Sequence, residues 1–139
     1  PARVAQLSRD AVIGTRCDIL VPAAVSYAIT AANAAEVEAD LIVEAANAPT
    51  TVDAELDLIA RGIAVIPDFI ANAGAVAWAW WLLLEYVGDD YRDSFRTLGA
   101  QMDAKVSSLL RDWQPSSGPI RWAADVSSTV RTPAPLVIP

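Results

Sequence analysis

Three short runs of aliphatic residues mark the first half of the chain, and a proline or a carboxylate closes each one. They cover residues 18–22, 41–44 and 63–66. Short apolar runs rich in β-branched residues and bounded by turn-forming residues are typical of buried strands. Helical patterns lie between them, and strands that alternate with helices indicate βαβ units. We therefore predict an α/β protein, with a three-stranded parallel sheet followed by long C-terminal helices.

The segments between the strands predict two helices. Residues 25–39 are rich in alanine, and Asn33 is a candidate N-cap within them. Residues 52–61 are amphipathic, and their early acidic residues suit the positive end of a helix dipole. Gly62 follows directly, and glycine is the residue most often found just beyond a helix C-terminus.

The second half of the chain has a different character. Residues 69–84 are apolar apart from Asn72 and hold three tryptophans: Trp78, Trp80 and Trp81. A membrane span needs about 20 apolar residues, so this stretch predicts instead a helix near residues 69–87, buried in a core or a subunit interface. Residues 91–112 predict a second long helix. Its apolar stripe has the spacing of a core-packed face: Phe95, Leu98, Met102, Val106 and Leu109.

The two ends of the chain carry weaker patterns. Residues 1–16 resemble an arm or a helix of weak periodicity, and the start at Pro1 lacks an initiator methionine and a signal peptide. We therefore expect a fragment of a longer protein. We interpret residues 114–139 as a linker, a short helix over residues 121–130 and a proline-rich tail.

Composition excludes several functions. The 139 residues carry a net charge of −7, which argues against a nucleic-acid surface or a polybasic membrane patch. The absence of histidine removes the commonest general base and metal ligand. A single cysteine, Cys17, excludes an internal disulfide and a paired-cysteine zinc site, and we expect a thiol without a functional role. We predict no metal site and a cytoplasmic protein.

Polar and small residues follow each predicted strand. They are the Pro22-Ala23-Ala24 segment, residues 44–51, which include Asn47, and Pro67-Asp68 followed by Asn72. Ligands of open α/β sheets bind beyond the carboxyl ends of the strands, where an asparagine offers both a donor and an acceptor. One asparagine after a strand is usually a turn residue, but a parallel sheet places all three segments on one edge. Asp68 could act as a base, although an N-cap role is favoured.

These segments carry a family resemblance. The blocks CDILVPAA (residues 17–24), EAANAPTT (44–51), Arg61-Gly62 and PDFIANAGAV (67–76) resemble the cofactor domain of the glutamate/leucine/phenylalanine/valine dehydrogenases. The resemblance is close over residues 10–88 and looser to residue 113. It implies that residues 1–113 form the C-terminal part of a Rossmann-like dinucleotide-binding domain. It also implies that the parent enzyme oxidatively deaminates an L-amino acid such as glutamate, with hydride passing to NAD or NADP.

The resemblance assigns roles to particular residues. Asn47 matches a family asparagine near the nicotinamide ribose, and Asn72 matches one near the nicotinamide and the substrate. Ala23 and Ala24 match small residues that line the cofactor cleft. Ala79 stands where glutamate-selective members place a serine near the substrate carboxylate. Because alanine cannot donate a hydrogen bond, which amino acid is the substrate stays open.

Several departures weigh against full activity. Ala45, Ala48 and Ala75 stand where the family usually has glycine, so each adds a β-carbon where the backbone needs a positive φ or close ligand approach. Tyr27 replaces a common asparagine. The 139 residues hold no glycine-rich phosphate loop. No residue is assigned a catalytic role: the family's catalytic lysine belongs to its substrate domain, and Lys105, the only lysine here, lies on the wrong element to replace it. The alternative is a non-catalytic oligomerisation module derived from such an enzyme, and we expect a homo-oligomer in either case.

Overall fold

A three-stranded parallel sheet forms the centre of the protein. The computed structural model describes Ser8, residues 10–114, Ser116 and residues 118–120. The strands β1 (Cys17–Leu20), β2 (Ala39–Val43) and β3 (Ala64–Ile66) pair in the order β1-β2-β3. Ile19 pairs with Leu41, which pairs in turn with Ala64. The prediction of three parallel strands is confirmed, with small differences in their bounds.

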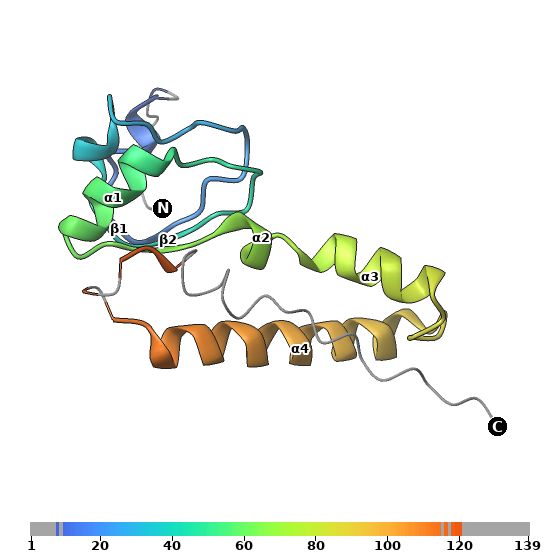
Figure 1. Ribbon diagram of the computed structural model, residues 1–139. Coiled ribbons are helices and arrows are strands. Elements are labelled where there is room, and N and C mark those ends of the chain that lie inside the picture. The colour runs from blue at the N-terminus through green and yellow to red at the C-terminus, as the bar shows by residue number, and fades with distance from the viewer. Residues whose placement is uncertain (1–7, 9, 115, 117, 121–139) are drawn as a thin grey trace, which may run out of the picture.

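Successive side chains of a strand point to opposite faces, and both faces of the sheet carry packed side chains, although Ile19 of β1 is 53% exposed. Ile42 and Val65 pack toward the helix α1 (Val52–Ala60) and the 3₁₀ turn η2 (Ala34–Glu36). The alternate residues of β2 and β3 pack toward the long helix α4 (Tyr91–Asp112). Figure 1 shows this helix on the other side of the sheet from α1. This second cluster gathers residues far apart in sequence: Leu41, Val43, Ala64, Ile66, Ile70, Val106, Leu109 and Ile120.

The predicted helix over residues 25–39 is wrong. This segment is irregular apart from η2 and an isolated parallel bridge between Ile29 and Thr50. The backbone of Ile29 forms hydrogen bonds with Pro49 and Thr51, on either side of Thr50, and these bonds hold the chain at Ile29 extended. Asn33 precedes η2 but does not cap it; its side chain instead bonds Thr30 N and Ala28 O and closes a turn. Long-range pairing has therefore overridden the helix propensity of the alanines.

Helix α1 ends as its sequence indicates. Arg61 is the C-cap, and Gly62 follows with a φ of 82°. Glycine reaches this left-handed conformation without the steric cost of a β-carbon. The tight turn leads directly into β3, so α1 returns the chain to the sheet.

The predicted helix near residues 69–87 is two helices. The short helix α2 (Asp68–Ala71) ends at Asn72, and α3 (Gly74–Leu83) follows after a break. Asn72 leaves the helical region with φ −104° and ψ 3°, and its side chain is engaged in a contact with the loop after β2. The N-cap of α2 is Pro67 rather than Asp68, which is the first helical residue.

Helix α3 lies beside α4 (Figure 1) but buries none of its residues completely. Trp78 stacks on Phe95 at a centroid distance of 5.0 Å, and its ring nitrogen donates to Ser94. Trp80 is 55% exposed and Leu83 is 71% exposed. Within this chain α3 is therefore not a core helix, so the core alternative of the prediction is wrong, and burial in a subunit interface stays a prediction.

Helix α4 begins at a carboxylate cap, since Asp90 accepts from the backbone of Arg92 and Asp93. Only the second half of its predicted stripe packs against the sheet, and Phe95 stays 51% exposed. Toward the N-terminus, the structure shows one 3₁₀ turn, η1 (Asp10–Val12). The predicted short helix over residues 121–130 and the tail that follows lie outside the described residues. Among the described helices, none has the length and apolarity to cross a bilayer.

Candidate functional site

The three strand ends meet at one edge of the sheet. The backbone N–H groups of Ala45 and Ala46 both donate to Pro22 O, at 3.2 and 2.9 Å. This contact joins the segment after β1 to the segment after β2. Ala23 and Ala24 follow Pro22 directly, and both are exposed. The edge therefore presents small residues and open backbone, which a flat ligand could approach closely.

The two candidate asparagines are in direct contact. Asn72 Nδ2 donates to Asn47 Oδ1 at 2.8 Å, so the loop after β2 and the end of α2 are joined at this edge. Asn47 is exposed and Asn72 is half-buried. The sequence placed each residue after a strand, and the structure shows that the two side chains form one unit.

Two carboxylates accept backbone hydrogen bonds in the segments that carry the asparagines. Glu44 is fully buried, and its Oε2 accepts from the backbone N–H of Asp68 at 2.9 Å. The two oxygens of Asp68 accept from the N–H groups of Phe69 at 2.8 Å and Ala48 at 2.7 Å. No role for Glu44 was predicted from the sequence. The available signal was a carboxylate at the end of a buried strand, since charged side chains are almost never fully buried without partners.

The turn beside the asparagines has unusual backbone conformations. Ala48 has a φ of 43° and Tyr27 a φ of 56°, and Tyr27 N donates to Ala48 O at 2.9 Å. The expectation of a positive φ is met at Ala48 but not at Ala45 or Ala75. Non-glycine residues in the left-handed region are strained and cluster at functional sites. Two of them meet here, beside Asn47.

Ala79 lies apart from the asparagine pair. It lines an apolar hollow of about 340 Å³ on α3, formed by five residues: Ala75, Val76, Ala79, Trp80 and Leu83. Neither Asn47 nor Asn72 contributes to this hollow. The structure therefore brings together four of the five candidate residues at the strand ends and leaves the fifth on the outer face of α3.

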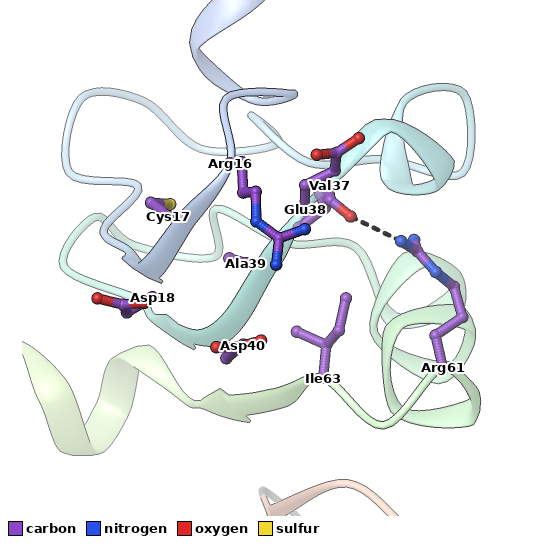
Figure 2. Close-up of a pocket in the computed structure, with 9 residues that line it drawn as sticks. All are labelled: Arg16, Cys17, Asp18, Val37, Glu38, Ala39, Asp40, Arg61 and Ile63. Atoms are coloured by element: carbon purple, nitrogen blue, oxygen red, sulfur yellow. Dashed lines mark hydrogen bonds between the residues drawn. The ribbon is translucent and has the colours of Figure 1, made fainter.

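A larger hollow of about 650 Å³ lies at the opposite, amino end of the strands (Figure 2). Charged side chains of both signs line it: Arg16, Asp18, Glu38, Asp40 and Arg61. Arg61 holds the loop that surrounds it, since its guanidinium donates to Ala34 O and Val37 O, each at 2.6 Å. Figure 2 shows the bond to Val37. Because this guanidinium is engaged by backbone carbonyls, we assign Arg61 a structural role.

The sequence model of the Glutamate/Leucine/Phenylalanine/Valine dehydrogenase family matches residues 2–119. The chain belongs to this family, and its sheet is the corresponding part of a Rossmann-like fold. The resemblance inferred from the strand-end blocks is thereby confirmed.

Individual relatives support the same family. The chain is 45% identical over 75 residues to the catabolic NAD-specific glutamate dehydrogenase of Bacillus subtilis, covering 54% of this chain and 18% of that enzyme. It is 39% identical over 118 residues to the NADP(+)-dependent glutamate dehydrogenase of Pyrobaculum calidifontis, covering 82% and 28%. A solved hetero-hexameric glutamate dehydrogenase from Thermus thermophilus matches with a TM-score of 0.69 at 22% identity, covering 93% and 34%. The chain thus spans 18% to 28% of the length of these two curated relatives.

Proposed function

We propose that this chain is the C-terminal part of the NAD- or NADP-binding domain of an amino-acid dehydrogenase. The parent enzyme would oxidatively deaminate an L-amino acid such as glutamate to a 2-oxo acid and ammonia. The observation that carries the proposal is the hydrogen bond between Asn72 and Asn47 at the carboxyl edge of a parallel sheet. Both the family membership and the names of the relatives support it.

The residues of the edge suit one end of a dinucleotide. Asn47 would contact the nicotinamide ribose and Asn72 the nicotinamide, while Ala23 and Ala24 would leave room along the cleft. When bound, the nicotinamide supplies the hydride acceptor. Ala79 lines the hollow on α3, apart from the asparagine pair, so its role near the substrate rests on the family resemblance alone, and its methyl group would offer no hydrogen bond there. In this proposal the chain binds and orients, and proton transfer belongs to residues outside these 139.

The longer protein encoded by the same gene provides the test. We expect a glycine-rich phosphate loop about one βαβ unit upstream, and amino-acid-dependent reduction of NAD or NADP in the purified product. Asn72→Ala should lower this activity strongly, whereas Asp103→Asn on the outer side of α4 should leave it unchanged. An intact, well-folded product that shows no reduction with any amino acid would contradict the proposal. We expect that protein in the cytoplasm.

A second candidate function is supported by helix α3. No charged residue occurs from Phe69 to Leu84, and Val76, Trp80 and Leu83 are all more than half exposed. Exposed apolar patches mark interaction sites, so the chain would serve as a non-catalytic module that associates with copies of itself. The solved structure from Thermus thermophilus is a hetero-hexamer. For this chain we expect a homo-oligomer in either function, because of the exposed apolar residues of α3. Self-association without any response to nucleotide would favour this second function.

A further inference from the structure

A closed ring of bonds connects the two asparagines. Asn47 is followed by Ala48, whose N–H donates to Asp68 Oδ2 at 2.7 Å. Asp68 O accepts from Asn72 N at 2.8 Å through one turn of α2, and Asn72 Nδ2 returns to Asn47 Oδ1 at 2.8 Å. Asp68 and Asn72 are four residues apart, so their side chains lie on one face of the short helix. The turn after β2 is therefore clamped at two points by α2.

Asp68 occupies the central position in this ring. One of its oxygens accepts from the N–H of Phe69, the next residue of its own helix. The other oxygen reaches across to the N–H of Ala48, the residue with the strained backbone. Behind it, the buried carboxylate of Glu44 accepts from Asp68 N and fixes where the helix begins. The carboxylate of Asp68 thus couples the two loops that carry the asparagines.

The hydrogen bond between the two amides leaves one polar group of each available. The oxygen of Asn47 is used by Asn72, so the NH₂ group of Asn47 is left to donate. The nitrogen of Asn72 is used by Asn47, so the oxygen of Asn72 is left to accept. Within the described part of the chain, these two groups have no protein partner. The edge therefore offers one donor and one acceptor side by side.

We propose that Asp68 is a positioning residue that holds the turn after β2 against α2, so that the two amides stay in contact and Asn47 turns a donor and Asn72 an acceptor toward the ligand. The proposal rests on the proposed function only in taking this edge as the ligand site. Asp68 itself touches no ligand in this scheme. It acts through Ala48 and through the helical turn that ends at Asn72.

Asp68→Asn in the full 139-residue chain tests the ring without any ligand. The amide keeps the shape of the carboxylate but replaces one acceptor oxygen with a donor, so one of the two N–H groups loses its partner. We expect hydrogen exchange at the Ala48 N–H to accelerate about tenfold or more, as for a lost charge-assisted hydrogen bond. The side-chain amide signals of Asn72 should shift as well, which a purely local role at the helix start would not cause. Asp103→Asn, the matched loss of an exposed carboxylate, should change neither.

Unchanged Asn72 side-chain signals and unchanged Ala48 exchange in Asp68→Asn would overturn the proposal. If this variant does not fold, the unaltered chain decides the question. The N–H groups of Asn47 and Ala48 share one exposed turn, but only Ala48 has a bonded acceptor. Slower exchange at Ala48 than at Asn47 supports the ring, and equal rates overturn it.

An isosteric pair of variants tests the amide orientation. Asn47→Asp keeps the oxygen that Asn72 uses, so the side-chain signals of Asn72 should stay near their original positions. Asn72→Asp removes the ring's donor and should disturb the turn at Ala48. The reverse pattern would overturn the assigned orientation.

NADH supplies the separate functional readout: we expect Asp68→Asn to weaken the binding of NADH about fivefold, the effect of one misplaced hydrogen bond. If NADH binds none of these chains measurably, the exchange data still decide the role of Asp68, and the proposed function is decided separately by amino-acid-dependent NAD or NADP reduction in the longer protein.

Discussion

Replacing Ala48 by glycine should stabilise the protein. Ala48 has a φ of 43°, in the left-handed region, and its side chain is exposed, so the substitution removes little packing. An L-residue in this conformation costs about 1–2 kcal/mol relative to glycine. Glycine also gains freedom in the unfolded chain, which costs about 0.4–1 kcal/mol. The difference predicts that Ala48→Gly raises the free energy of unfolding by about 0.5–1 kcal/mol.

Ala46→Gly is the matched control. Ala46 lies in the same loop, but its φ is not positive, so glycine brings only the entropic cost. We expect this variant to lose about 0.4–1 kcal/mol. The two variants should therefore change stability in opposite directions although they remove the same methyl group two residues apart.

Equilibrium urea unfolding followed by tryptophan fluorescence measures both variants, since the chain holds five tryptophans. The midpoint should rise for Ala48→Gly and fall for Ala46→Gly, with the slope m unchanged. If Ala48→Gly destabilises the protein as much as Ala46→Gly does, the turn is not strained, and the reasoning about this turn is wrong.

Two further predictions concern regions outside the asparagine pair. Arg61→Gln should destabilise the chain by about 2 kcal/mol, because two carbonyls, Ala34 O and Val37 O, lose a charged donor. Arg96→Gln, which alters an exposed ion pair, should lower the free energy of unfolding by less than about 0.5 kcal/mol. Equal losses in the two variants would refute the structural role assigned to Arg61. Sedimentation should show an oligomer that Trp80→Gln weakens, because this indole is 55% exposed on an uncharged helix. A monomer at high concentration would contradict the association.

The sheet could be predicted from the sequence because its signals are local. Each strand is a short aliphatic run with a turn residue at its end. The side chains of β2 and β3 pack on both faces of the sheet, so their runs need no alternation. The helix prediction for residues 25–39 was wrong because alanine content indicates a helix, whereas the backbone of Ile29 pairs with the loop around Thr50. That pairing depends on the tertiary arrangement, and no local pattern reports it.

The site was predictable only in part. The strand-end rule and the family blocks identified Asn47 and Asn72, but not that their side chains meet. The partners Asp68 and Ala48 are separated by 20 residues and come together only when β2 and β3 pair. The break that frees Asn72 from a continuous helix was missed for the same reason, since an apolar run carries no sign of it.

A nitrogen–proton NMR titration of the 139-residue chain with NADH would locate the cofactor on this sheet. We expect shifts at the carboxyl edge, at Ala23, Ala24, Asn47 and Asn72, with none in the hollow around Arg16 and Asp40. Affinity should be millimolar or weaker, because these residues include no phosphate loop to supply a helix N-terminus for the diphosphate. Shifts confined to the Arg16 hollow, or micromolar affinity, would contradict the account.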